Sequence, residues 1–352
     1  MGRVGYHPMK TSEIIEMSVP KKITVTTLVH IPELVGFWEN SLDVLKLSLS
    51  SLFAHTDQEF DFMVFDNGSC KEVYDYLSEE YQNGNIQYLF FSEKNLRKTD
   101  ALPIIFREAP GEIICYFDSD VYFLPNWLDE SLKVLEKFPE IGMLTACPVA
   151  RNKSSFMYKS TYKGVSNLDK IEKKVGNNLI DEKYIVSHAL SVGVGISDYK
   201  RDRLNKREDF LITYDGVSAF ITAVDFQYIT TKKAIDSVKD EWDDLQINLI
   251  KSKVKHLRGA QIGPPTFQIL TDKNGFWKLS TKDYLVHHMG NRIPDFSVEL
   301  PWIDLAKLKI LPNQKQKNIV KRRNKNIILR STRLRRLVKK IHLWTYKFLY
   351  ES

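Results

Sequence analysis

The sequence predicts an α/β fold in which a mixed, mainly parallel sheet is flanked by helices. Three observations support this prediction. Short, β-branched apolar segments alternate with segments of helical periodicity, the connections between them are short, and polar turns follow the strand segments. The length of 352 residues and the 43% share of hydrophobic side chains suffice for one large domain with a substantial core.

Four strands are predicted in the first half of the chain, because short runs rich in β-branched and aromatic residues occur at 23–29, 60–65, 86–91 and 112–117. Leu42, Leu45 and Leu49 recur at helical spacing and predict a helix over 41–53. Further helices are expected over 71–81 and about 101–108. Pro103 is compatible only with the first turn of the last of these helices.

The pattern is looser after residue 145. Residues 151–183 are polar and basic without a clear period, and we expect a mobile excursion there. Strands are expected at 216–222 and at 282–291, the second ending in histidines. Residues 240–250 open with acids and then turn apolar at helical spacing, which predicts a helix with an acidic amino end.

The charge of the chain is unevenly distributed. Residues 305–352 carry 15 basic side chains and one acid, a balance of +14, so the other 304 residues hold 36 basic and 43 acidic side chains. Apolar residues from Leu334 to Phe348 fall on one helical face and basic residues fall opposite, which predicts a basic amphipathic helical tail. Docking on an anionic membrane surface through residues 315–350, packing on a protein surface and nucleic-acid binding all remain open. We expect no nucleic acid, because the rest of the chain is acidic and lacks a recognition motif.

Cysteine usage and the amino-terminal sequence indicate the compartment. The three cysteines, Cys70, Cys115 and Cys147, have neither zinc spacing nor the pattern of a disulfide framework. No stretch approaches the roughly 18–20 apolar residues of a membrane span, and residues 1–22 lack the apolar core of a signal peptide. We therefore expect a cytoplasmic protein, peripheral on the cytoplasmic membrane face if its tail docks there.

An acidic triplet, Asp118-Ser119-Asp120, directly follows the strand predicted at 112–117. Two carboxylates one residue apart at a strand exit suit a hard divalent cation, because Mg²⁺ and Mn²⁺ prefer carboxylate oxygens and commonly share their shell with substrate phosphates. The competing interpretation is an ordinary turn or helix cap.

Three segments together form a wider pattern. Residues 62–69 are an apolar strand ending in Asp-Asn-Gly-Ser, residues 93–102 run Glu-Lys-Asn-Leu-Arg-Lys-Thr-Asp-Ala-Leu, and residues 111–120 are Gly-Glu, an apolar strand and Asp-Ser-Asp. In this order they resemble the family 2 glycosyltransferases, which have a GT-A type, Rossmann-like fold and an Asp-x-Asp motif. The resemblance covers about 21–292 and is strongest over 60–130. Arg97 replaces the family's usual glycine, and Pro103 stands where asparagine is frequent.

The resemblance implies a domain organisation and an activity. An N-terminal extension (1–20) precedes a nucleotide-sugar-binding half (21–145), an acceptor-binding half (146–300) and the tail (301–352). The implied reaction moves a sugar from a nucleotide-diphosphate donor to a glycan or lipid-linked acceptor, as in polysaccharide biosynthesis, by a single inverting displacement. The expected donor is a UDP-sugar, with a GDP-sugar second, and the expected cofactor is Mn²⁺ or Mg²⁺.

The resemblance also implies roles for individual residues, although each has a plainer interpretation as a turn, cap or core residue. The nucleotide-sugar contacts would be Thr27, His30, Asp66, Asn95, Arg97, Lys98, Asp118 and Ser119. The metal ligands would be Asp118, Asp120 and His288, with His287 as the alternative to His288. The base that deprotonates the acceptor would be Asp244 or Asp243, with Glu241 as a third candidate.

Two other functions stay open. A sugar-phosphate nucleotidyltransferase also uses acidic metal ligands on an α/β fold, but it needs a glycine-rich basic loop after the first strand, and residues 27–32 lack one. The other alternative is a catalytically inactive, membrane-associated relative of the glycosyltransferases.

Overall fold

The computed structural model describes residues 19–138, 140–149, 158–167, 169–193, 207–251 and 264–311, without the side chains of 242–251 and with few of those of 264–269. The chain divides into two units, Met1–Pro312 and Asn313–Ser352. The second unit lies outside the described residues, and so does the amphipathic helix predicted within 315–350.

A ten-stranded sheet with the order β3-β2-β1-β4-β10-β6-β11-β9-β8-β7 forms the centre of the first unit. Its strands are β1 (Ile23–Val29), β2 (Asp61–Asn67), β3 (Tyr88–Ser92), β4 (Ile113–Asp118), β6 (Ile141–Thr145), β7 (Glu172–Gly176), β8 (Asp209–Tyr214), β9 (Val217–Phe220), β10 (Gln227–Thr231) and β11 (Trp277–Thr281).

The strand pairings make the sheet mixed and mainly parallel. Strands β1 to β4 are mutually parallel, and β10 runs antiparallel to both β4 and β6. Following the remaining pairings, only β7, β9 and β10 oppose the direction of the other seven strands. The predicted fold class is therefore confirmed for the sheet and its flanking helices.

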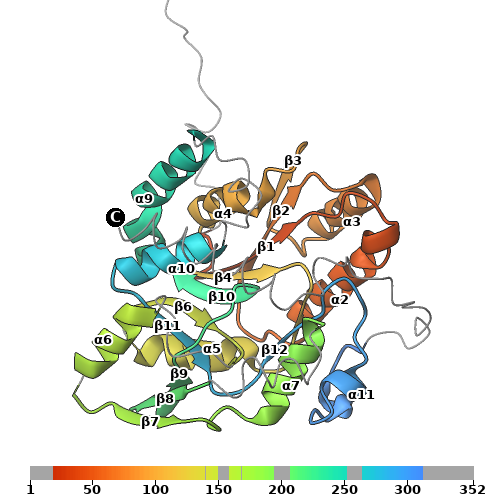
Figure 1. Ribbon diagram of the computed structural model, residues 1–352. Helices are drawn as coiled ribbons and strands as arrows, with labels where there is room; N and C mark the ends of the chain where they lie inside the picture. Colours follow the sequence, from red (N-terminus) through yellow and green to blue (C-terminus); the bar gives the residue numbers. More distant parts are fainter. Residues whose placement is uncertain are drawn as a thin grey trace, which may run out of the picture. The chain divides into compact units, whose positions relative to one another are not determined.

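Helices cover both faces of the sheet because alternate strand residues point to opposite sides. On β2, Phe62 and Val64 belong to the core under α2 (Ser41–Ala54), α3 (Lys71–Gln82) and α5 (Trp127–Lys137). Met63 and Phe65 belong to a second core under α4 (Arg97–Glu108), α9 (Lys232–Lys251) and α10 (Pro264–Lys273). Figure 1 shows α4, α9 and α10 grouped together, apart from α2 and α3.

Helix α4 starts earlier than predicted. It runs from Arg97 to Glu108, so Pro103 lies in its interior and not in its first turn. An interior proline removes one helical backbone donor, which normally weakens a helix. Burial compensates here, because Ala101, Leu102 and Phe106 are fully buried against the sheet.

The helix predicted at 240–250 also begins earlier, at Lys232. Ala234, Ile235 and Val238 recur at helical spacing and are buried, and this apolar face extends the helix towards β10. The acidic residues from Asp240 onward therefore lie in the interior of α9, and the expected acidic amino end is wrong.

The excursion expected over 151–183 contains regular structure, although residues 150–157 and 168 lie outside the described part. Helix α6 (Lys159–Asn167) and strand β7 occupy it, and α7 (Glu182–Ser191) follows. Among the described residues β7 pairs with β8 alone and is largely exposed, which accounts for its lack of an apolar pattern. Gly164 lets α6 approach β11, since a Cβ there would lie 2.3 Å from the Trp277 indole nitrogen.

A small second sheet pairs β5 (Val121–Phe123) with β12 (Val286–His288) in antiparallel orientation. It connects the turn after β4 to a segment more than 160 residues later in the chain. Short elements η1 (Gly36–Trp38), α11 (Phe296–Glu299) and η4 (Leu305–Lys307) complete the described fold. Within the described residues, no helix is both long and apolar enough to cross a membrane.

Candidate active site

The predicted site residues of the first half meet at one edge of the sheet. Strands β1, β2 and β4 are parallel, and their register aligns Val29 with Asp66 and Leu28 with Asp118. The carboxyl ends of these strands therefore present His30, Asp66 and Asp118 on the same side. Open α/β sheets commonly bind ligands at this edge.

A ring of hydrogen bonds orders the loops around the ends of β1 and β2. His30 Nδ1 lies 3.0 Å from the Asn67 carbonyl oxygen, and His30 Nε2 lies 2.8 Å from Asn95 Nδ2. Asn67 Nδ2 donates to Asn95 Oδ1 at 3.1 Å and closes the ring. These contacts fit a neutral imidazole whose Nδ1 donates and whose Nε2 accepts.

Asn67 is a central residue that the sequence argument missed. Its side chain is almost fully buried, and its Oδ1 also accepts from the Leu96 backbone N–H at 2.8 Å. The signal was present in the Asp66-Asn67-Gly68 turn, but such a turn indicates no contact to a loop 28 residues later. The buried amide therefore fixes the position of Asn95, which was predicted to contact the donor.

Asp66 has an unused hydrogen-bonding atom. Its side chain is buried, its Oδ2 accepts from the Ser69 backbone N–H at 3.3 Å, and its Oδ1 is buried without a partner. Burial raises the pKa of this carboxyl, although hydrogen bonds from Ser69 oppose the shift. A buried carboxylate oxygen without a partner is costly, and a ligand that donates to it would remove that cost.

Asp118 is already engaged within the protein. Its Oδ1 accepts from Lys98 Nζ at 2.5 Å and from Tyr116 Oη at 2.8 Å. Burial raises the pKa of Asp118 above its usual value, Lys98 lowers it and Asp120 raises it again. Lys98 thus neutralises Asp118. Its ammonium group lies beside the acidic triplet, where it could also contact a diphosphate.

Arg97 adopts a backbone conformation that few residues other than glycine favour. Its φ angle is 66°, in the left-handed region. Glycine, which has no Cβ, adopts this conformation without strain. The loop keeps its shape in this chain at the cost of local backbone strain.

Asp120 and His288 face each other because of the β5–β12 pairing. His288 pairs in register with Val121, and the Met289 backbone N–H donates to the Asp120 carbonyl at 2.7 Å. His288 Nε2 lies 3.1 Å from Asp120 Oδ2, while Asp120 Oδ1 is buried without a partner. Burial lowers the pKa of His288, but Asp120 and Asp118 raise it by more, so it lies above its usual value.

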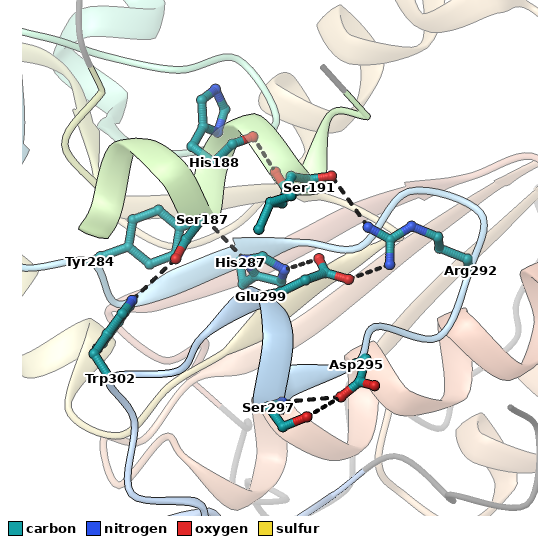
Figure 2. Close-up of polar contacts among 11 residues, drawn as sticks. Ser187, His188, Ser191, Tyr284, His287, Arg292, Asp295, Ser297, Glu299 and Trp302 are labelled. Carbon is teal, nitrogen blue, oxygen red and sulfur yellow. Dashed lines mark hydrogen bonds and ion pairs between the residues drawn. The ribbon is translucent and has the colours of Figure 1, made fainter. Parts of the chain in front are cut away.

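The neighbouring His287 faces the opposite way. It is fully buried, with Nδ1 3.1 Å from Tyr284 Oη and Nε2 3.0 Å from Glu299 Oε2 (Figure 2). Of the two histidines that the sequence left open as ligands, His288 is therefore the one beside the acidic triplet.

The remaining predicted residues have mixed placements. Thr27 is fully buried, and its hydroxyl donates to the Phe117 carbonyl at 2.9 Å, so its side chain joins β1 to β4 inside the sheet and a nucleotide would not reach it. Ser119 lies in the turn after β4. Asp243 and Asp244 lie on α9, but their side chains are outside the described residues.

Glu241 does not lie near the acidic triplet. It pairs with Lys273 at 2.8 Å, just before the segment that enters β11. Strand β11 begins beside Ile141, at the amino end of β6, whereas Asp118 lies at the carboxyl end of β4. The third candidate base is therefore paired with the end of α10.

The donor set suits a cation that also binds a substrate. Within the described part of the chain, no three or more His, Cys, Asp or Glu side chains form a ready metal cluster. Asp120 nevertheless has an oxygen without a partner beside His288. Mg²⁺ and Mn²⁺ commonly use one or two protein carboxylates and take their other ligands from phosphates and water, so these residues fit such an ion.

A pocket of about 400 Å³ opens next to Asp120 and His288. It is also lined by Phe37, by Ser191 at the end of α7 and the two residues after it, and by the loop after β12 including Arg292. The pocket thus continues from the acidic triplet into the second half of the chain.

Comparison with known proteins agrees with the predicted family. Residues 39–189 match the family model described as Glycosyl transferase family 2. No curated protein matches the chain.

Similar solved structures include the mannosyltransferase PcManGT from Pyrobaculum calidifontis in complex with GDP-Man and Mn²⁺, with 20% identity, 38% of this chain and 36% of that chain covered, and a TM-score of 0.30. S. aureus TarS 1-349 is 14% identical, with coverage of 76% and 60% and a TM-score of 0.39. GalNAc-T7 with UDP, GalNAc and Mn²⁺ is 19% identical, with coverage of 37% and 23% and a TM-score of 0.30. The chain thus spans less than two thirds of each of these structures.

Proposed function

We propose, because residues 39–189 match the family model described as Glycosyl transferase family 2, that the chain is a metal-dependent, inverting glycosyltransferase. The donor is a nucleotide-diphosphate sugar, with UDP as the first expectation and GDP as the second. The acceptor is a glycan or a lipid-linked glycan. The observation that carries the proposal is the buried Asp120 oxygen without a partner, which faces His288 beside a pocket.

The nucleotide is proposed to bind at the ends of β1 and β2. Asp66 Oδ1 would accept a hydrogen bond from the base or ribose and so satisfy a buried oxygen that has no partner. The ring of His30, Asn67 and Asn95 holds the neighbouring loop in place for that contact. Lys98 and Arg97 supply positive charge where the diphosphate would lie.

Asp120 and His288 would hold the cation, while the neighbouring Asp118 is paired with Lys98. The bound Mn²⁺ or Mg²⁺ supplies charge neutralisation for the diphosphate as it departs. Water and phosphate oxygens would provide the remaining ligands of the cation.

The transfer is proposed as one in-line displacement at the anomeric carbon. The acceptor hydroxyl oxygen forms the new bond, the bond from the anomeric carbon to the diphosphate oxygen breaks, and a carboxylate takes the hydroxyl proton. Asp244 is proposed as this base and Asp243 as its substitute.

Turnover of a panel of nucleotide sugars, followed by mass spectrometry with Mn²⁺ or with EDTA, tests the proposal. We expect turnover that depends on the cation and is lost in Asp120→Ala. Asp244→Asn should lower kcat by at least about 100-fold with little change in donor affinity, since general-base catalysis contributes about 10²–10⁴-fold. Asp236→Asn, at an exposed position of the same helix, is the matched control. Full activity of Asp120→Ala in EDTA would refute the metal assignment.

The tail and the compartment extend the proposal beyond the described residues. We propose that residues 315–350 dock on an anionic cytoplasmic membrane face, where a lipid-linked acceptor would be presented. Flotation of the whole chain and of a 1–310 truncation with anionic vesicles tests this, and equal recovery of both would contradict it.

A further inference from the structure

The pocket beside Asp120 contains a positively charged side chain that has no role in the proposed reaction. Among the described residues that line it, Arg292 is the one with a permanently charged basic side chain. Arg292 follows the end of β12 by four residues and lies on the loop that leads on from His288. This loop also contacts η1, because Asn291 Nδ2 donates to the Phe37 carbonyl at 2.7 Å.

Arg292 is held from behind by a buried acid. Its guanidinium is paired with Glu299 Oε1, and its Nη2 donates to the Leu190 carbonyl at 3.3 Å. Figure 2 shows the guanidinium between α7 and Glu299, so two elements of the second half of the chain fix it.

Glu299 is itself fixed and ionised. It is buried at 4% exposure, and its Oε2 lies 3.0 Å from His287 Nε2. Burial alone would raise the pKa of Glu299, but hydrogen bonds from His287 and Arg292 lower it to about 2. Burial lowers the pKa of His287, whose ring is held between Glu299 at Nε2 and Tyr284 Oη, 3.1 Å from Nδ1.

The network therefore orients Arg292 and still leaves part of its side chain exposed to the pocket. A guanidinium that served only to neutralise Glu299 would be buried with it, but the Arg292 side chain is 35% exposed and lines the pocket, whereas that of Glu299 is 5% exposed. A long side chain already held in one orientation loses little conformational entropy when it binds a ligand. The rigid fork of arginine recognises phosphate or carboxylate oxygens through two parallel hydrogen bonds.

We infer that this pocket is a phosphate-binding subsite in which Arg292 contacts the ligand, and in which Glu299 and His287 are positioning residues. A phosphate there has two sources: the diphosphate of a donor at Asp120, or a phosphate carried by the acceptor. The inference rests on the proposed function only for these sources. Phosphate binding by Arg292 itself is measurable whether or not the chain transfers a sugar.

The test is calorimetric titration of the full chain with Mn²⁺ present, first with UDP and then with glycerol 3-phosphate in the presence of UDP. We expect Arg292→Gln to lower the affinity measured in at least one of the two titrations by about tenfold to 100-fold. This is the contribution of a hydrogen bond to a charged group. Loss of UDP affinity identifies the donor as the source, and loss of glycerol 3-phosphate affinity identifies the acceptor. Lys133→Gln removes a comparable charge from the exposed face of α5 and should change neither titration.

The positioning role has its own readout. Glu299→Gln should lower the same affinity several-fold. The double variant with Arg292→Gln should bind the probe no more weakly than Arg292→Gln alone. Guanidinium ion at a concentration too low to denature should partly restore binding to Arg292→Ala. Affinities for both probes that are equal in Arg292→Gln, Lys133→Gln and wild type would overturn the inference. If UDP fails to bind but glycerol 3-phosphate binds through Arg292, the proposed function fails and the subsite stands.

Discussion

Asp118 and Asp120 should respond in opposite directions when each loses its charge, although they lie two residues apart. Asp118 Oδ1 accepts hydrogen bonds from Lys98 and Tyr116, whereas Asp120 Oδ1 is buried without a partner. The two side chains are similarly accessible, at 29% and 27% exposed. Differences between Asp118→Asn and Asp120→Asn therefore report on their partners more than on their depth.

The expected magnitudes follow from these contacts. Asp120→Asn relieves a buried, unsatisfied charged group that costs roughly 1–3 kcal/mol. It also loses the partly exposed pairing with His288, which contributes about 1 kcal/mol at most. The metal-free protein should therefore become more stable by about 1 kcal/mol, or by roughly 2 °C in Tm for a chain of this size. Asp118→Asn weakens two charge-assisted hydrogen bonds and should lose about 1–2 kcal/mol.

Scanning calorimetry of both variants in EDTA measures these shifts, and a second scan with UDP and Mn²⁺ measures binding. The ligands should stabilise the wild type by about 2.7 kcal/mol at a hundredfold excess over Kd, and Asp120→Asn should lose the part that depends on Mn²⁺. A common direction of change for the two variants in EDTA would refute the reasoning from hydrogen-bond partners. Stabilisation of Asp120→Asn by Mn²⁺ equal to that of wild type would refute its role as a ligand.

Three further predictions concern the loops and the Arg292 network. Asn67→Ala should lower the free energy of unfolding by about 2 kcal/mol and weaken UDP binding, because it opens the hydrogen-bond ring and leaves the Leu96 N–H without its acceptor. Chemical denaturation measures the stability and calorimetric titration measures the UDP affinity. Arg97→Gly should raise stability by up to about 1 kcal/mol, since relief of roughly 1–2 kcal/mol of left-handed strain exceeds the 0.5–1 kcal/mol entropic cost of glycine, and a lower Tm would contradict this. The pKa of Glu299 falls from 4.5 to about 2 on folding, so its contribution is complete above pH 4.5 and disappears as the pH falls towards 2. The difference in unfolding free energy between wild type and Glu299→Gln should shrink across that window, and a constant difference would contradict the assigned pKa.

The first half of the fold was predictable because its signals are local. The strand at 23–29 has the bounds of β1, and the strands expected at 60–65 and 112–117 differ from β2 and β4 by only one or two residues. In each, an apolar β-branched or aromatic run ends at a polar turn, and burial on both faces of a sheet requires that composition. The second half was harder, because β7 is an exposed edge strand whose pairing with β8 leaves no apolar pattern to detect.

The site was predictable as a set of residue types but not as a set of contacts. Asp66, Asp118 and Asp120 follow from strand ends and motif order, which are properties of neighbouring residues. The engagement of Asp118 by Lys98, the burial of Thr27 inside the sheet and the role of Asn67 depend on how separate loops meet. Sequence spacing does not fix such distances.

The pairing of β5 with β12 unites the two halves of the site. It places His288 beside Asp120, and on the next residue back it directs His287 towards Glu299 and away from the acidic triplet. Adjacent strand residues point to opposite sides, so His288 faces Asp120 at the proposed cation site, whereas His287 contacts Glu299, the partner of Arg292. A substitution that shifted this register by one residue would exchange the two histidines and disable both functions together. The sequence favours His288 as the ligand with His287 as the alternative, and strand geometry gives the two adjacent histidines different partners.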